Sequence, residues 1–108
     1  MADLQWDRAF ALEQAGDDEE MLAELLDLLR SSGQADLERI KAAMTGGDAQ
    51  AMGDAAHSIK GAAASLGMES LRLVAHELEK AGRSGDLAGA SRLLPDLEAM
   101  LAGLAAVC

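Results

Sequence analysis

The spacing of the apolar residues is the feature that most limits what this chain can fold into. Leucine, methionine and isoleucine recur every three or four residues in several segments, and no stretch alternates β-branched with polar residues as a half-buried strand does. Leucine and alanine dominate the apolar residues, and both favour helices. Aromatic residues make up only 2 % of the chain, and Pro95 is its one proline. The sequence therefore predicts an all-α protein.

Glycine-rich turn signals divide the chain into candidate helices. A short helix is predicted over residues 6–14, followed by a longer one that Asp17 or Asp18 caps. Gly33 either breaks this second helix or only weakens it, since the apolar pattern resumes after it.

The second half of the chain shows three further helices. Asp48 is expected to cap the first of them and Gly67 to close it. The next is predicted over residues 69–81. The last begins after Asp86, and Pro95 is expected to bend it or to set its effective start.

Short connections between amphipathic helices favour antiparallel neighbours. We therefore expect an antiparallel up-down four-helix bundle with a short extra N-terminal helix, as a single domain over residues 1–108. Four long helices in one chain can close a bundle without a partner, so a monomer is expected.

The charge of the chain is strongly acidic and unevenly distributed. The formal net charge is −10, and residues 1–56 contribute −9 of it with 4 basic and 13 acidic side chains. Nucleic acid and anionic membrane surfaces are poor partners for such a chain, because both are bound through lysine and arginine. No apolar run approaches the roughly 18 residues of a membrane span.

The cysteine and histidine content gives no metal site and no disulfide. Cys108 is the only cysteine, and the two histidines, His57 and His76, lie 19 residues apart. These residues do not form a standard ligand set. A single cysteine fits a reducing compartment, and we expect a cytoplasmic protein.

The segment "AHSIKGAAASLG", residues 56–67, contains the most unusual pattern of the sequence. At about 100° per residue, a helix centred on Ile59 buries a face that includes Met52, Ala56, Ala63 and Leu66. His57 lies about 160° from Ile59 and points away from that face.

The neighbours of His57 on the helix are small. Gly53 and Gly61 lie one turn before and after it, and Ala64 shares their face. Each glycine costs a helix about 0.5–1 kcal/mol relative to alanine. We interpret them as facing outward and leaving room for another protein, while close helix packing is the alternative explanation.

Three other side chains need an interpretation. Lys60 lies beside His57, one turn further along the helix. Asp54, three residues before His57, is interpreted as a solvated helix acid. His76 is interpreted as a solvated histidine on a polar helix face, where no glycine clears space around it.

An exposed neutral imidazole is a nucleophile. Phosphoryl transfer needs such a nucleophile, positive charge near the transferred oxygens and room for the donor. His57, Lys60 and the glycines fit these three roles. The chain has no GxxxxGK[ST] loop, no kinase loops and no GxSxG segment, so the pattern indicates a phosphoryl carrier without an ATP site of its own.

This pattern resembles the signature of the histidine-containing phosphotransfer (HPt) domains of two-component signalling, H-x-[hydrophobic]-K-G followed by small residues, a hydrophobic residue and glycine. The resemblance extends to "LRLVAHELEKAGRSGD" and "GDDEEMLAELLDLLR". It implies a helical bundle that exchanges a phosphoryl group between a histidine and an aspartate of a response-regulator receiver domain. That receiver belongs to a separate regulator or to a hybrid histidine kinase.

The resemblance also implies residue roles. His57 would be the phosphoacceptor, Lys60 would help to hold the phosphoryl oxygens, and Gly61 would keep the approach open. Ser65 lies where family members often carry asparagine or another polar residue. Mg²⁺ is expected on the receiver domain, and no cofactor on this chain. Many members carry a proline where this chain has Ser31-Ser32-Gly33.

Two other functions are compatible with a helical bundle. One is an adaptor that binds a receiver domain without accepting a phosphoryl group. The other is the dimerisation and phosphoacceptor domain of a histidine kinase. In such kinases an acidic residue follows the histidine, whereas Ser58 follows His57 here.

Overall fold

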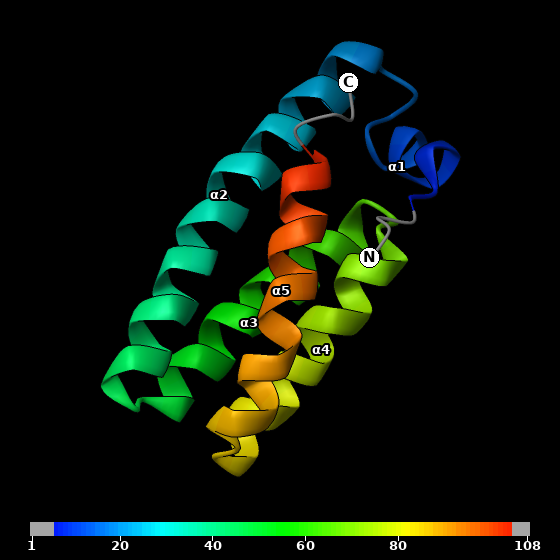
Figure 1. Cartoon of the computed structure of the whole chain (residues 1–108). Coiled ribbons are helices and arrows are strands. Elements are labelled where there is room, and N and C mark those ends of the chain that lie inside the picture. Colours follow the sequence, from blue (N-terminus) through cyan, green and yellow to red (C-terminus); the bar gives the residue numbers. More distant parts are fainter. Residues whose placement is uncertain (1–5, 105–108) are drawn as a thin grey trace.

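The fold is built from five helices, and a computed structural model describes residues 6–104 of the chain. The helices are α1 (Arg8–Gln14), α2 (Glu19–Gly46), α3 (Ala49–Ser65), α4 (Glu69–Ser84) and α5 (Leu87–Leu104). No strand occurs within residues 6–104. The four long helices form an antiparallel bundle and α1 lies at one end of it (Figure 1). The all-α class and the four-helix bundle with a short N-terminal helix are thus confirmed.

The apolar stripes predicted by the helical spacing form a single buried core. Every helix contributes to it, and its largest fully buried side chains are Leu22, Ile40, Met52, Ile59, Met68, Leu71, Leu78, Leu97 and Leu104. All five residues that the sequence assigns to the buried face around Ile59 are buried, four of them in α3 and Leu66 as its C-cap. The bundle therefore fixes which side of α3 faces the core and which faces outward.

Two glycine–aspartate pairs reverse the chain direction. Gly47 and Gly85 end α2 and α4 in the left-handed region, with φ of +71° and +75°, where glycine is favoured. The carboxylates of the next residues, Asp48 and Asp86, accept hydrogen bonds from backbone N–H groups in the first turns of α3 and α5. Each reversal thus takes only two residues, which makes the joined helices antiparallel neighbours.

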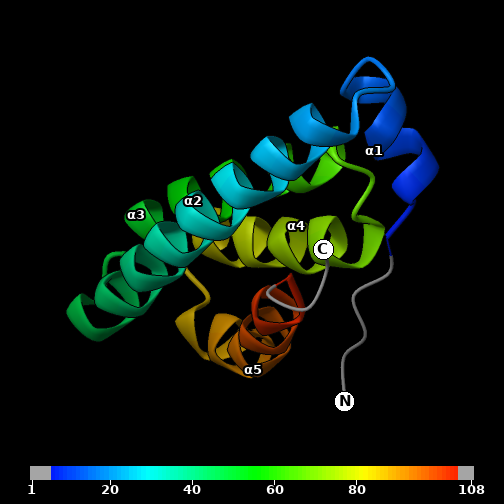
Figure 2. The ribbon, with the colours of Figure 1, turned by 90° about the horizontal axis from the view of Figure 1, so that it is seen from above.

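The connection between α3 and α4 is covered by α1. Gly67 closes α3 with φ of +69°, as predicted. The Trp6 indole N–H donates to the Leu66 carbonyl at 2.8 Å, and the Asp7 N–H donates to the Gly67 carbonyl at 3.0 Å. A Cβ at Gly67 would lie 2.9 Å from the Phe10 ring. The short helix is therefore held across the end of the bundle (Figure 2).

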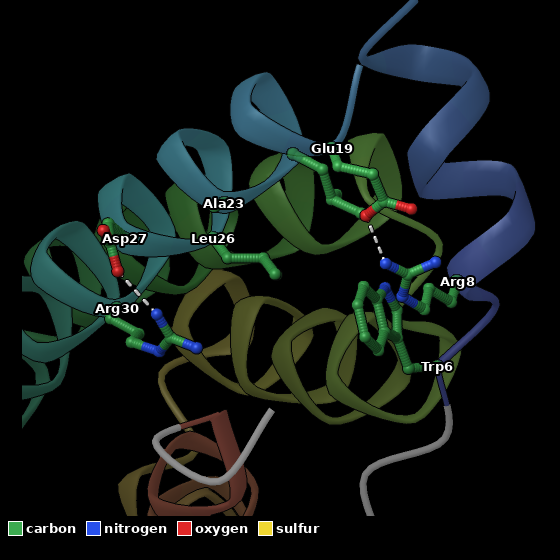
Figure 3. A pocket seen from close by; sticks show the side chains of 8 residues that line it. Trp6, Arg8, Glu19, Ala23, Leu26, Asp27 and Arg30 are labelled. Carbon is green, nitrogen blue, oxygen red and sulfur yellow. Dashed lines mark hydrogen bonds and ion pairs between the residues drawn. The ribbon is translucent and has the colours of Figure 1, made fainter. Parts of the chain in front are cut away.

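A hollow of about 240 Å³ lies between α1 and the first half of α2, with Trp6 on its wall (Figure 3). Arg8 and Glu19 form an ion pair across it, and Arg30 pairs with Asp27 at 2.6 Å. The Arg30 Nε–H also donates to the Leu104 carbonyl at 2.8 Å. These contacts connect α1, α2 and the end of α5.

The long helix α2 runs without interruption through Gly33. Its N-cap is Asp18, one of the two predicted. Gly33 is buried, and a Cβ there would lie 3.0 Å from the Leu101 side chain of α5. The glycine is thus a place of close approach between α2 and α5, and it does not break the helix.

The start of α1 and the end of α4 differ from the predicted ones. The helix α1 begins at Arg8 and not at residue 6, because the Asp7 side chain caps its N-terminus. The helix α4 continues past residue 81, because Gly82 is packed against α3 as part of the helix and Gly85 ends it instead. The helix α5 begins at Leu87, directly after the Asp86 cap, as predicted, and it continues through Pro95. Pro95 therefore does not set the start of α5.

Among residues 6–104, no helix is long and apolar enough to cross a membrane. In the same part of the chain, histidine, cysteine and carboxylate side chains form no group of three that could hold a metal ion. Cys108 lies outside the described residues.

Candidate functional site

The imidazole of His57 stands on the outer face of α3, with 62 % of its side chain exposed. The helical wheel is confirmed in this respect. The ring is not isolated, because Nδ1 lies 2.7 Å from Oε2 of Glu79 on α4. An ionised carboxylate can only accept, so in the neutral ring Nδ1 carries the proton and Nε2 keeps its lone pair. The contact therefore selects the tautomer in which Nε2 is the nucleophilic atom.

Glu79 is the centre of this site, with only 13 % of its side chain exposed. The Lys60 ammonium donates to its Oε1 at 2.5 Å, and the Arg83 guanidinium lies 3.6 Å from its Oε2. The hydrogen bond from Lys60 lowers the pKa of the Glu79 carboxyl below its ordinary value, the bond to His57 also lowers it, and burial acts in the opposite direction. Glu79 is therefore an ionised acceptor at neutral pH.

Asp54 contacts Arg83 and not the imidazole. The Arg83 guanidinium donates to the Asp54 carboxylate at 2.8 Å, and this bond raises the pKa of Arg83. Both side chains are about half exposed. The acid three residues before His57 thus lies on the rim of the site, in an ion pair that joins α3 to α4.

The outward position predicted for Gly53 is wrong. Gly53 is buried against α4, and a Cβ at Gly82 would lie only 2.7 Å from the Gly53 Cα and 2.8 Å from the Ala49 carbonyl oxygen. The helical wheel correctly shows which side of α3 faces the core. It cannot show that α4 covers one flank of the outer face, because the position of α4 does not follow from the sequence of α3 alone. Close helix packing explains this glycine.

The contact between the two glycines also positions the site. His57 lies one turn after Gly53 in α3, and Glu79 lies one turn before Gly82 in the antiparallel α4. Where the helices touch at Gly53 and Gly82, the next turn therefore places the carboxylate opposite the imidazole. Glu79 and Arg83 were not among the predicted site residues, because their i, i+4 spacing is also that of an ordinary exposed ion pair on a helix.

The open side of His57 is formed by the other predicted residues. A Cβ at Gly61 would have no neighbour within 4 Å, and Ala64 and Ser65 are exposed. The Ser65 hydroxyl donates to the Gly61 carbonyl at 3.0 Å within α3. His76, predicted as a solvated histidine on a polar helix face, is partly buried on α4. The space beside the imidazole thus comes from Gly61 and the residues that follow it.

Comparison with known families shows the family to which the chain belongs. Residues 24–107 match the family model of the Hpt domain, and this stretch contains the whole segment around His57. The chain belongs to the Hpt family. It is therefore a histidine phosphotransfer module of a phosphorelay, and no match favours the adaptor or the kinase dimerisation domain.

Solved structures of Hpt proteins share the fold. Histidine-containing phosphotransfer protein B from Pseudomonas aeruginosa PAO1 is 30 % identical, with a TM-score of 0.84 over 92 % of this chain and 86 % of that one. The Hpt domain of a sensor hybrid histidine kinase from Shewanella is 23 % identical, with a TM-score of 0.75 over 94 % and 92 %. No curated protein matches the chain.

Proposed function

We propose that His57 is the phosphoacceptor of this Hpt module and that it exchanges the phosphoryl group with an aspartate of a response-regulator receiver domain. The observation that carries the proposal is the exposed imidazole whose Nδ1 is held by Glu79 at 2.7 Å. This contact leaves Nε2 as the atom that can attack, on the side of the ring that a partner can reach.

The transfer step follows from this tautomer. The Nε2 lone pair forms the new bond to phosphorus, and the bond between phosphorus and the aspartyl oxygen breaks, so that the aspartate leaves as a carboxylate with the electron pair. The ring becomes an imidazolium, and the proton remains on Nδ1, where the Glu79 carboxylate stabilises it. No proton has to be removed, so the step can run in both directions.

Charge near the transferred group comes from both proteins. Lys60 lies one turn after His57, and its ammonium is already held close by Glu79. It can approach the phosphoryl oxygens and offset their charge. This chain requires no cofactor for the step, and a Mg²⁺ ion on the receiver domain would bind the oxygens on the side of the aspartate.

Room for the receiver domain comes from the open side of α3. Gly61, Ala64 and Ser65 follow the imidazole along the outer face with little side-chain bulk. A larger side chain at Gly61 would stand beside the ring and keep the partner's backbone at a distance. Gly53 has no such role, because α4 covers it.

Substitution of the acceptor tests the proposal. A receiver domain carrying a ³²P-labelled aspartyl phosphate is expected to label the wild-type chain and His76→Gln, but not His57→Gln. The label should be lost in acid and kept in base, as is typical of a phosphorus–nitrogen bond. Labelling of His57→Gln at the wild-type rate would show that another residue accepts the phosphoryl group.

The oligomeric state and the location of the module form a second part of the proposal. All the side chains around His57 come from α3 and α4 of the same molecule. We therefore infer that the module acts as a monomer. We also infer a cytoplasmic location, because the phosphoryl groups of a relay originate from ATP.

A further inference from the structure

An apolar groove runs between α2 and α3, on the flank of α3 that faces α2 and not Glu79 of α4. It has a volume of about 320 Å³, and we call it the α2–α3 groove. It is lined mainly by Leu25, Leu28, Leu29, Ala62, Ser65 and Leu66. Since Ser65 also belongs to the open side of His57, the groove and the proposed acceptor site form one continuous surface.

Leu28 is the most conspicuous side chain of this surface. It is 65 % exposed. Among the described residues, the other exposed large apolar side chains are Phe10, Met21 and Leu73, and each of them is less exposed than Leu28. Leu22, Leu26 and Leu29 already supply the buried face of this part of α2. The fold does not require a leucine at this position, and an apolar side chain that stands beside an apolar groove is typical of a binding surface.

The groove lies within reach of a protein that docks on His57. Ser65 is eight residues beyond His57, which corresponds to about 12 Å along the axis of α3. A standard interface covers about 800 Å² on each partner, which is a disc of about 16 Å radius. A receiver domain centred on the imidazole with an ordinary footprint therefore reaches the edge of the groove at Ser65.

Acidic side chains flank Leu28 on its outer side. A shallow hollow there is lined by Glu24, Asp27, Leu28 and Ser31. Asp27 pairs with Arg30 but leaves 75 % of its side chain exposed, and Glu24 is exposed. Residues 17–28 contain six acidic side chains and no basic one. The surface beside the groove therefore attracts a basic partner and repels an acidic one.

We propose that Leu28 and Glu24 determine which receiver domain this module accepts. The cognate receiver inserts an apolar side chain into the α2–α3 groove against Leu28 and places a lysine or arginine opposite Glu24. Receivers with an acidic residue at that place are rejected by repulsion. This inference depends on the proposed function, because it assumes that the receiver docks over His57.

The test separates docking from chemistry by using two phosphoryl donors. Phosphoramidate is small and needs no docking surface, whereas a phosphorylated receiver does. Leu28→Ala and Glu24→Lys are each expected to slow transfer from the cognate receiver about tenfold at sub-saturating concentration. Labelling of His57 by phosphoramidate should be unchanged in both variants. Transfer to the wild type should also fall with rising salt, and less steeply in Glu24→Lys.

Asp96→Lys is the matched control, since it makes the same charge reversal at an exposed position of α5. Transfer by both groove variants at the wild-type rate, or an equal loss in Asp96→Lys, would overturn the proposal. A dimer of the wild type that Leu28→Ala dissociates would also overturn it, because a second copy would then occupy the groove. Failure of phosphoramidate to label His57 would instead contradict the proposed function.

Discussion

At the scale of single residues, the chemistry of the site depends on one carboxylate. Glu79 accepts hydrogen bonds from the ring nitrogen of His57 and from Lys60 on its two oxygens. The first contact sets the tautomer of the nucleophile, and the second keeps the positive charge close to it. In the proposed transfer, Glu79 is thus a positioning residue, which acts on the phosphoryl group through His57 and Lys60.

Replacement of Glu79 by glutamine is expected to weaken the preference of the His57 ring for the tautomer with the proton on Nδ1. The amide can accept from Nδ1–H or donate to Nδ1, so both tautomers become populated and the imidazolium formed on transfer loses its counter-charge. We expect transfer to slow between about twofold and tenfold. The ¹⁵N chemical shifts of the ring should show Nε2 as the unprotonated nitrogen in the wild type and a mixture in Glu79→Gln. Equal shifts in the two proteins would contradict this role.

The stability of the fold should depend on Glu79 at acidic pH. The pKa of its carboxyl is lowered in the folded state from an ordinary value of 4.5, chiefly by Lys60. Its contribution is therefore fully present above pH 4.5 and is lost as the pH falls through the lowered value. Urea unfolding of wild type and Glu79→Gln between pH 7 and pH 3 should show a stability difference that shrinks with acid. A difference that stays constant over this range would contradict the lowered pKa.

The sequence alone identifies half of the site. His57, Lys60 and Gly61 lie within five residues of one helix, so their relative positions follow from helix geometry. Glu79 and Arg83 lie about two dozen residues further along the chain. Their place opposite His57 depends on the register of α4 against α3, which no local pattern contains.

At the scale of helices, three glycines of α3 and α4 have different roles. Gly53 and Gly82 allow the two backbones to touch, and Gly61 leaves one side of His57 open. A helical wheel assigns Gly53 and Gly61 to one outer strip, because they are related in the same way to His57. Only the position of α4 distinguishes them.

Alanine substitutions should separate these roles. Gly82→Ala places a methyl group 2.7 Å from the backbone of Gly53, so we expect a loss of about 2 kcal/mol or more in the free energy of unfolding. Gly61→Ala enters open space and should gain about 0.5–1 kcal/mol from helix propensity while slowing transfer from a receiver. Urea unfolding and a transfer assay measure both effects. A destabilised Gly61→Ala would show that this position is packed.

The helix boundaries could be predicted where side chains define them locally. Asp18, Asp48 and Gly67 act as caps, in agreement with the sequence. The end of α4 differs from the predicted one because glycine usually interrupts helices, and Pro95 was expected for the same reason to disturb α5. Here Gly82 is needed for contact with α3, and the Asp86 cap has already started α5 before Pro95.

At the scale of the whole molecule, the chain forms a short rod with extents of 42 × 24 × 19 Å. Its four long helices surround one core, and α1 covers the connection between α3 and α4. The acidic charge lies mostly on the first half of the chain, whereas the segment around His57 and α4 is almost neutral. The molecule thus offers a partner a central contact with almost no net charge and an acidic flank.

We expect the free module to be monomeric, because the bundle closes within one chain. Light scattering or sedimentation should give a mass near 11.2 kDa over a range of concentrations. Leu28→Ala should give the same mass. A mass near twice this value would indicate that a second copy covers part of the surface described above.

The cationic partners of Glu79 also affect the lifetime of a phosphoryl group on His57. A carboxylate that already accepts from Lys60 and His57, and whose pKa is lowered, is a weak base. It is poorly suited to remove a proton from a water molecule that approaches the phosphorus atom. We therefore expect hydrolysis of the phosphohistidine to be slow in the isolated module, so that the half-life of the stored signal is set by the receiver that takes the phosphoryl group away.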